Sequence, residues 1–175
     1  MRSLRQQVAQ PLDQSYRFIP LTQNQIAIVD AEDFERISQY LWYASWNVNT
    51  KSFYAARKTL KRDGPRKIIM LHSFIMDPPE GMEVDHEDWN TLDDRIDNLR
   101  ICTPGQNKAH RRSAGESGYR GVYRDKSCNR WKVAIGRERK YLGLYESPEE
   151  GALAYDREAI RLYGKFAVLN FPNQV

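Results

Sequence analysis

Four side chains between residues 84 and 112 have the chemical types needed to cleave a phosphodiester bond. Asp85 offers a hard oxygen ligand, and His86, directly after it, offers a proton acceptor. Further along, Asn98 can act as an orienting amide and Asn107 as a second oxygen ligand. This set could place one divalent cation beside one base, the minimum needed to hydrolyse a phosphodiester. The sequence therefore predicts a metal-dependent nuclease.

Local signals predict the elements that position these residues. We expect a strand at 82–86, a long polar loop at 87–98 and a second strand at 99–102. The sequence T-P-G-Q at 103–106 then places Thr at a helix N-cap, Pro at the first helical position and Gln three residues after the cap. The predicted helix runs to about residue 112. Asn107 falls in its first turn, where its side chain can face back toward the end of the first strand.

This segment resembles a known family. The motifs V-D-H at 84–86, L-D-x-R-x-x-N-L-R at 92–100 and Q-N-x-x-H at 106–110 are similar to the HNH nuclease motif of homing endonucleases from phages and mobile introns. Upstream, L-H-S-F-I-M at 71–76, followed by P-P-E-G-M, resembles the lead-in to that motif, so specific residues match over roughly 70–112. The resemblance implies a ββα-metal arrangement, which the capping signals support independently.

The resemblance also implies a mechanism and a set of roles. Asp85 and Asn107 would hold one hydrated divalent ion, Mg²⁺ with Mn²⁺ as a substitute, on double-stranded DNA. His86 would take a proton from the attacking water, and Asn98 would fix the loop and orient His86. An unperturbed imidazole is mostly neutral at cellular pH, as a base requires. Cleavage would leave 3′-hydroxyl and 5′-phosphate ends, with no small-molecule substrate involved.

Several of these residues have alternative interpretations. Asn98 or Asn107 could cap a turn or a helix instead of serving the reaction. His110, three residues after Asn107, is a rival metal ligand. We expect His72 to be a packing or helix-start residue.

A change of texture after the small polar segment 113–118 predicts a linker and a second small domain. Three short strands are expected at 119–124, 130–136 and 139–145. The sequence S-P-E-E at 147–150 opens a helix that runs to about Tyr163 and ends at Gly164. Four residues of this helix recur at helical spacing and should face the sheet: Ala152, Tyr155, Ala159 and Leu162.

The second domain resembles the apetala-two (ethylene-response-factor) type of DNA-binding domain. The similar motifs are Y-R-G-V at 119–122, Y-L-G-L-Y-E-S at 141–147, the helix E-E-G-A-L-A-Y-D-R-E-A-I-R-L-Y-G and the closing A-V-L-N-F-P, which together cover almost all of 118–172. By this resemblance Arg120, Arg139 and Tyr141 match DNA-contacting positions. Positions 123, 125 and 136 lack the basic residues usual in the plant domains, so sheet-in-groove docking carries over but the recognised sequence does not.

Charge supports a DNA-binding sheet without the resemblance. Residues 118–145 carry eight basic and two acidic side chains, a net charge of +6, whereas residues 146–163 carry a net charge of −3. Alternation along the strands points Trp131, Val133, Ile135, Leu142 and Leu144 toward the helix. Val122 would share a face with Arg120 and Arg124 unless a bulge at Gly121 intervenes. The predicted DNA contacts are Arg120, Arg124, Lys132, Arg139 and Tyr141.

The N-terminal part carries weaker signals. Residues 1–16 should be a flexible tail, and strands are expected at 25–30, 41–46 and 53–58, with a further apolar run at 67–71. A hairpin turn is expected at 47–52 and a short helix at 33–39. The basic cluster between 57 and 67 is either a solvated hairpin tip or a phosphate-contacting hairpin. We expect the aromatic side chains of Trp42, Tyr43 and Trp46 to belong to the core.

Composition sets the outer bounds. The chain has 175 residues, a net charge of +4 and a pI near 9.1, which favours a polyanionic partner. Two cysteines do not make a disulfide framework or a zinc site, and Cys102 should be buried. No signal peptide or membrane span is expected, which suggests a cytoplasmic protein. The resemblance to homing endonucleases implies a bacterial or phage-infected cell.

We therefore expect an α+β protein with a tail (1–16), an HNH nuclease domain (17–112), a linker (113–118) and an apetala-two-like domain (119–175). The main functional hypothesis is a homing-type DNA endonuclease that acts as a monomer or as a DNA-induced dimer. The second hypothesis is a DNA-binding transcriptional regulator with an inert HNH scaffold. A structural zinc module lacks the required four-ligand set.

Overall fold

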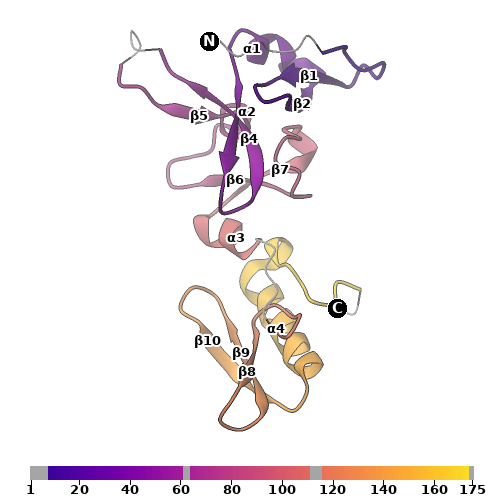
Figure 1. Cartoon of the computed structure of the whole chain (residues 1–175), viewed down its shortest axis with the longest axis vertical. Coiled ribbons are helices and arrows are strands. Elements are labelled where there is room, and N and C mark those ends of the chain that lie inside the picture. Colours follow the sequence, from indigo (N-terminus) through magenta and orange to yellow (C-terminus); the bar gives the residue numbers. More distant parts are fainter. Residues whose placement is uncertain (1–7, 61–63, 111–115, 174–175) are drawn as a thin grey trace. The chain divides into compact units, whose positions relative to one another are not determined.

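The computed structural model describes residues 8–60, 64–110 and 116–173. The chain divides into two compact units, Met1–Cys102 and Thr103–Val175 (Figure 1). Several small antiparallel sheets and a few helices make up the fold, which confirms the predicted α+β class. Among the described residues, no helix combines the length and the apolar character needed to traverse a lipid bilayer.

The first unit begins with two small antiparallel sheets. One is the hairpin of β1 (Tyr16–Pro20) and β2 (Ile26–Asp30). The other contains β3 (Tyr43–Asn47), β4 (Ser52–Lys58) and β5 (Ile68–Met70) in that order. The predicted strands at 25–30, 41–46 and 53–58 and the apolar run at 67–71 correspond to β2–β5. The strand β1 is not among the predicted elements, and its first residue, Tyr16, corrects the predicted end of the tail at residue 16.

Helices follow β2 and β5. The predicted helix at 33–39 is present as η1 (Ala31–Asp33) and α1 (Phe34–Ser38). The helix α2 (Leu71–Met76) was not predicted, and it places His72 in its first turn, as the helix-start interpretation required. The strands β6 (Glu83–His86) and β7 (Leu99–Cys102) then pair antiparallel, and the loop between them contains η3 (Ile96–Asn98). The strand–loop–strand prediction for 82–102 is confirmed.

One apolar core holds the elements of the first unit together. Buried side chains from β1, β2, α1, β3, β4, α2, β6 and β7 all contribute to it. Trp42 is 1% exposed, and its indole Nε1 donates a hydrogen bond to the Ile37 carbonyl at 2.9 Å, so its one polar atom is satisfied inside the core. Trp46, expected in the core, is instead 51% exposed, and its ring packs edge-on against Phe53.

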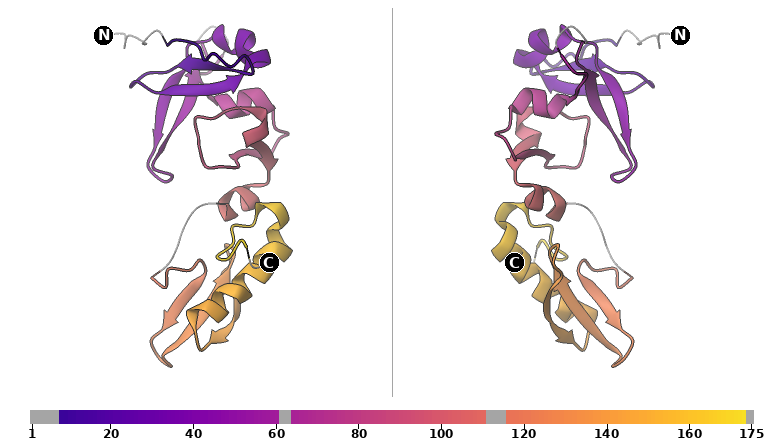
Figure 2. Two further views of the ribbon diagram at one scale, coloured as in Figure 1. Left: turned by 90° about the vertical axis from the view of Figure 1, so that its right-hand side faces the viewer. Right: turned by 90° about the vertical axis from the view of Figure 1, so that its left-hand side faces the viewer.

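The second unit consists of a short helix followed by a sheet and a longer helix. The elements are α3 (Pro104–Ala109), β8 (Val122–Asp125), β9 (Arg130–Ile135), β10 (Lys140–Tyr145), α4 (Pro148–Tyr163) and η4 (Gly164–Phe166). The sheet order is β10-β9-β8, and α4 lies along one face of it (Figure 2). Ser147 caps α4 by accepting a hydrogen bond from the Glu150 backbone at 3.2 Å, as its sequence predicts.

Most of the predicted sheet alternation is confirmed, with two corrections. Val133 and Ile135 are buried against α4, and Trp131 packs on the same cluster. A β-bulge between Tyr141 and Gly143 shifts the alternation in β10, so Leu144 lies opposite Lys132 on the outer face instead of pointing inward. Leu162 is also wrong: it is 42% exposed, whereas the other three predicted helix residues are buried.

The division between the units lies before α3, whereas the expected nuclease domain extends to residue 112. A guanidinium N–H of Arg120 donates to the Ala109 carbonyl at 2.6 Å, and α3 packs on η4, so α3 is tied to the second unit. The predicted last residues of this helix (111–112) and the start of the linker (113–115) lie outside the described residues. The same holds for positions 1–7 of the predicted tail.

Candidate active site

The β6–β7 hairpin places the Asp-His pair at the end of a buried strand. Antiparallel pairing sets Asp85 opposite Arg100 and His86 opposite Leu99. Asp85 is 8% exposed and His86 is 4% exposed. A buried charge or imidazole requires polar partners, so the partners of these two side chains define the site.

Arg100 is the partner of Asp85. Its Nε donates to Asp85 Oδ2 at 2.9 Å, and its Nη2 lies 2.8 Å from the same oxygen. Both side chains are more than nine-tenths buried, so the attraction is little screened by water. The cross-strand guanidinium fixes the carboxylate in one orientation and supplies positive charge beside it. Nothing in the sequence around Arg100 predicts this contact with Asp85.

Asn98 closes the loop that follows His86. Its Oδ1 accepts from the Asp88 backbone at 3.0 Å, and its Nδ2 donates to the Asp93 carbonyl at 2.8 Å. Its own carbonyl accepts from the Glu87 backbone at 2.8 Å. One side chain thus joins the two ends of loop 87–98, and its donors and acceptors are matched inside the protein.

The same loop is pinned to strands from the start of the chain. The backbone of β2 bonds to it twice at 2.8 Å, through Ile28 N–H to the Leu92 carbonyl and through Asp94 N–H to the Ile28 carbonyl. On the other side, Thr91 Oγ1 donates to the Phe53 carbonyl of β4 at 2.6 Å. These bonds give the loop, expected from sequence only to be polar, a fixed path. We call the hydrogen-bonded attachment of residues 91–94 to β2 and β4 the loop clasp.

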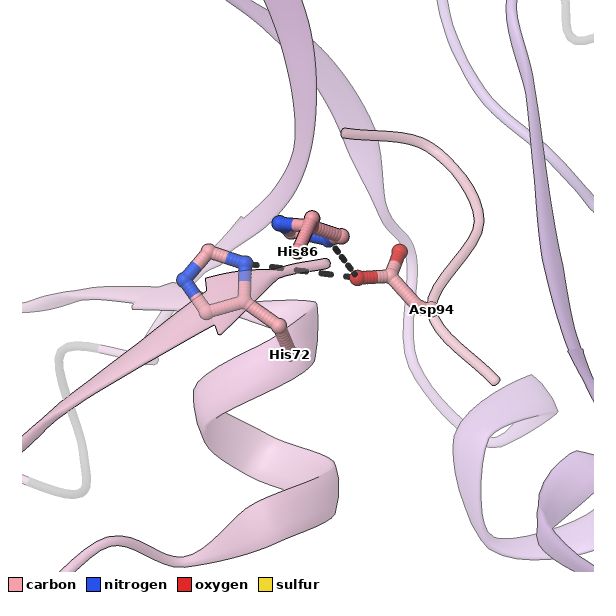
Figure 3. Close-up of side chains that lie close together, drawn as sticks. All are labelled: His72, His86 and Asp94. Atoms are coloured by element: carbon pink, nitrogen blue, oxygen red, sulfur yellow. Dashed lines mark hydrogen bonds and ion pairs between the residues drawn. The ribbon is translucent and has the colours of Figure 1, made fainter. Parts of the chain in front are cut away.

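The loop clasp brings Asp94 to His86 (Figure 3). His86 Nε2 and Asp94 Oδ1 are 3.1 Å apart, and Asp94 is 1% exposed. His72, on α2, completes a cluster of three buried side chains, with its Nδ1 4.0 Å from the same Asp94 oxygen. The two imidazole rings lie 5.0 Å apart between centroids, edge to face, and Tyr54 packs edge-on against both.

Burial controls the protonation of this cluster. Desolvation, helped by the neighbouring His86, lowers the pKa of His72 to about 3, so its imidazole is neutral at pH 7. Complete burial raises the pKa of Asp94, and the hydrogen bond with His86 acts in the opposite direction. A carboxylate that accepts the Nε2 proton leaves His86 Nδ1 as the basic ring nitrogen.

The sequence missed His72 and Asp94 as members of the site. His72 lies on a helix that precedes the strand, and Asp94 lies in the loop that follows it. Neither stands at a position of the quoted motifs that has a chemical role. Asp94 can be recognised as part of the site only from the fold, which shows that its carboxylate is buried and lies next to His86.

Asn107 and His110 belong to the second unit. Asn107 lies in the first turn of α3, as predicted, and Thr103 and Gln106 form the expected capping box there at 3.2 and 2.8 Å. His110 is 5% exposed at the C-terminal end of the same helix. Their roles as metal ligands therefore remain predictions.

The outer face of the β8–β10 sheet carries paired cations and aromatic rings. The Arg139 guanidinium lies 4.8 Å from the centroid of the Tyr123 ring, and Lys132 Nζ lies 5.6 Å from that of Tyr141. Tyr141 is 54% exposed, and Tyr123 is 40% exposed. Cation–π contacts hold the charged groups against this surface while leaving their donors toward solvent.

Arg120 and Arg124, the other two predicted DNA contacts, have partners within the unit. Arg120 Nε donates to the Tyr155 hydroxyl at 3.0 Å, in addition to the contact with Ala109. Arg124 lies over the Trp131 ring at 4.9 Å, on the face that Trp131 turns toward α4. Gly121, directly before β8, has φ +75° and precedes the fully buried Val122, so the chain enters the strand through a residue with left-handed backbone.

The basic cluster of the first unit lies on the β4–β5 hairpin. Arg57 is stacked 4.0 Å from the centroid of the Tyr40 ring and 5.3 Å from that of Phe74, so it serves packing. Lys58, Arg66 and Lys67 are exposed, whereas positions 61–63 lie outside the described residues. Cys102 is fully buried, as expected.

Comparison with known families agrees with both halves of this description. Residues 77–109 match the model of the HNH endonuclease family, a segment that contains Asp85, His86, Asp94, Asn98 and Asn107. This match supports a nuclease at the level of the family and shows the resemblance first seen in the motifs.

Other parts of the chain are similar to plant transcription factors. The ethylene-responsive transcription factor ERF024 of Arabidopsis thaliana is 46% identical over 61 residues, 33% of this chain and 33% of that protein. The Arabidopsis factor WRI1 is 48% identical over 63 residues and APETALA2-like protein 2 of Oryza sativa is 46% identical over 61, but these matches span only 15% and 14% of those proteins. The chain thus spans a third or less of the length of these relatives.

Proposed function

We propose that this protein is a metal-dependent DNA endonuclease of the homing type, whose second unit holds the target. The observation that carries the proposal is the Asp85-His86 pair at the end of β6, inside the segment that matches HNH endonucleases, with the His86 ring held by a buried carboxylate. The alternatives differ in whether this pair performs chemistry.

The donors proposed for the metal fit a hard cation. By the family resemblance, Asp85, whose orientation Arg100 fixes, would contribute a carboxylate oxygen, and Asn107 would contribute an amide oxygen. Oxygen donors of this kind are those that Mg²⁺ or Mn²⁺ binds in proteins. When bound, such an ion supplies Lewis-acid stabilisation of the charge that develops at the scissile phosphate.

His86 would act as the general base. In this proposal Nε2 carries the ring proton and donates it to Asp94, 3.1 Å away, so that Nδ1 keeps the lone pair that takes the proton of the attacking water. Asn98 acts through the loop: it ties 88 to 93 and thereby keeps Asp94 against the ring. We infer that Asn98 and Asp94 are positioning residues and that His86 is the catalytic residue.

The second unit would supply affinity and register on double-stranded DNA. Lys132, Arg139 and Tyr141 share the outer sheet face, where cations can reach phosphates and the tyrosine can contact a base or sugar. Arg120 would contact DNA only by exchanging its present hydrogen-bond partners, whereas Arg124 lies on the sheet face that turns toward α4. One such site cuts one strand at a time, so a monomer would nick and a DNA-induced dimer would cut both strands. We place the enzyme in the cytoplasm of a bacterial or phage-infected cell, the setting of homing nucleases.

A second candidate is a DNA-binding transcriptional regulator in which the HNH segment is a scaffold. Two observations favour it: the relatives matched by other parts of the chain are transcription factors, and both Asp85 and His86 are buried with partners inside the protein. In this hypothesis the Asp85–Arg100 and His86–Asp94 contacts only stabilise the fold.

Plasmid cleavage distinguishes the two candidates. Supercoiled DNA is incubated with Mg²⁺ and either the native chain or His86→Ala, at protein concentrations that give equal DNA occupancy, and circular dichroism verifies that both are folded. Conversion to nicked or linear product by the native chain alone supports the endonuclease. If both bind but neither cuts with a range of DNAs, in Mg²⁺ or Mn²⁺, the regulator is favoured. Equal cutting by both would remove His86 from its role.

A further inference from the structure

We propose that His72, His86 and Asp94 form a second metal site, selective for a transition-metal ion such as Zn²⁺, and that filling this site switches off the nuclease. The three side chains come from α2, β6 and the loop after β6, and each offers one donor atom. All of these donor atoms lie within 4.8 Å of one another (Figure 3). The switching half of the inference rests on the proposed function, whereas the binding half does not.

The spacing of the donors is close to that of a zinc site. Zinc–nitrogen and zinc–oxygen bonds of about 2.0–2.2 Å at tetrahedral angles place ligand atoms about 3.4 Å apart. His86 Nε2 and Asp94 Oδ1 are 3.1 Å apart, and His72 Nδ1 and Asp94 Oδ1 are 4.0 Å apart. A contraction of at most about 1.4 Å between donor atoms, within the range of side-chain rotation, would complete the geometry.

Among the described residues, two of the cluster's polar atoms find no hydrogen-bond partner. His72 Nδ1 and Asp94 Oδ2 are both fully buried and both without a hydrogen bond. Buried polar atoms are normally matched, because an unmatched one loses its hydration without compensation. A metal ion would satisfy His72 Nδ1 directly and would balance the charge of Asp94.

The donor set selects the metal. Two imidazole nitrogens and one carboxylate suit Zn²⁺, Co²⁺ or Cu²⁺, whereas Mg²⁺ prefers an all-oxygen octahedron and retains its water. Three protein ligands would leave a fourth position for water. The loop clasp holds Asp94 from its backbone, and Tyr54 packs on both rings, so the ligands are already oriented. Neither Asp85 nor Asn107 takes part, and the two sites share no ligand.

Binding at this site would remove the base. Coordination through His86 Nε2 requires that nitrogen to give up its proton, and the neutral ring then carries its proton on Nδ1. The Nδ1 lone pair, which should accept the proton of the attacking water, is lost. Zinc would therefore block cleavage without competing for the Asp85 site, and additional Mg²⁺ would not relieve the block.

Cobalt binding tests the site independently of any cleavage. The untagged full chain is freed of metal with a chelator and titrated with Co²⁺, whose visible absorption reports tetrahedral N/O coordination, and Zn²⁺ is then added as competitor. We expect one equivalent to bind with the tetrahedral absorption, and we expect His72→Phe or Asp94→Asn to weaken that binding by about 100-fold or more. His72→Phe retains an aromatic ring beside Tyr54, and thermal unfolding of each metal-free variant verifies its fold. His110→Phe, the same change at another buried histidine, should bind cobalt like the native chain.

Zinc titration of cleavage in Mg²⁺ then tests the switch, with each variant compared to its own zinc-free rate. Zinc should inhibit the native chain, and a variant that no longer binds cobalt should resist it. Cobalt binding that survives His72→Phe and Asp94→Asn, or that is lost only in His110→Phe, would overturn the assignment. If the native chain binds cobalt as expected but never cleaves DNA, the proposed nuclease fails while the metal site stands.

Discussion

The strongest stability prediction concerns Gly121, where the chain enters β8. A Cβ built at this glycine would lie 2.2 Å from Tyr155 Cδ2 and 2.8 Å from the Ala134 carbonyl oxygen. Ordinary carbon contacts are about 3.5–4.0 Å, so the Tyr155 ring would have to move by more than 1 Å. That ring is buried and its hydroxyl accepts from Arg120, and the Ala134 carbonyl belongs to a paired strand, so neither neighbour can yield easily.

The magnitude has two parts. An L-residue in left-handed backbone costs about 1–2 kcal/mol, and overpacking a core site costs about 1–3 kcal/mol. Gly121→Ala should therefore destabilise the second unit by about 2–5 kcal/mol. Gly118→Ala is the matched control, because Gly118 has nearly the same φ, +79° against +75°, and nothing within 4 Å of its added Cβ. Gly118→Ala should therefore be destabilised only by the backbone contribution, about 1–2 kcal/mol.

Hydrogen exchange of the full chain, followed on peptides from β8–β10, measures the effect in the unit concerned. Protection of these peptides should fall far more in Gly121→Ala than in Gly118→Ala, and peptides from β6–β7 should be unaffected by either change. DNA binding should weaken in the same order. Equal losses in the two variants would refute the reasoning, because the contact with Tyr155 would then contribute nothing.

Three further predictions concern the second unit. Arg139→Ala should weaken DNA binding and reduce the slope of log K against log salt concentration by about one, without changing the single-turnover cleavage rate of bound DNA. Intact binding with slowed cleavage would contradict the proposed roles of the two units. Asp156→Ala should cost about 2–4 kcal/mol in chemical denaturation, because the fully buried carboxylate accepts two hydrogen bonds from Asn170, at 2.8 and 3.0 Å, and a loss below about 1 kcal/mol would contradict this. Hydrogen bonds from Arg161 lower the pKa of Glu158 from 4.5 to about 2, so the stabilisation by this ion pair is present above pH 4.5 and is lost as the pH falls toward 2. Glu158→Gln should flatten the plot of unfolding free energy against pH in this range, and an unchanged plot would exclude the ion pair as the cause.

Local signals were sufficient for several elements around the candidate site. The strands β6 and β7, the capping box of α3 and the start and end of α4 follow from residue type and short spacing, because each depends on contacts within a few residues. The inward alternation in β9 is of the same kind. These features could be predicted because the physical cause lies inside the segment itself.

Other features depend on contacts between distant segments. Nothing near Asp94 in sequence indicates that it meets His86 or that His72 joins them, since the clasp to β2 and β4 decides this. Likewise the bulge in β10, which places the Leu144 side chain on the outer face of the sheet, arises from pairing with β9. The orientation of such residues is set by the fold and not by a pattern in the chain.

The loop clasp also limits how the nuclease motif can be moved between proteins. The segment that matches the HNH family, residues 77–109, obtains the position of one of its carboxylates from backbone atoms of residues 28 and 53. Cut out and grafted elsewhere, this segment would carry the side chains proposed to bind the metal and to act as the base, but not the partner strands that orient them. The smallest segment that could be transferred with the site intact therefore includes both N-terminal sheets. Recombination at the boundaries of the motif alone would leave Asp94 without the strands that hold it against His86.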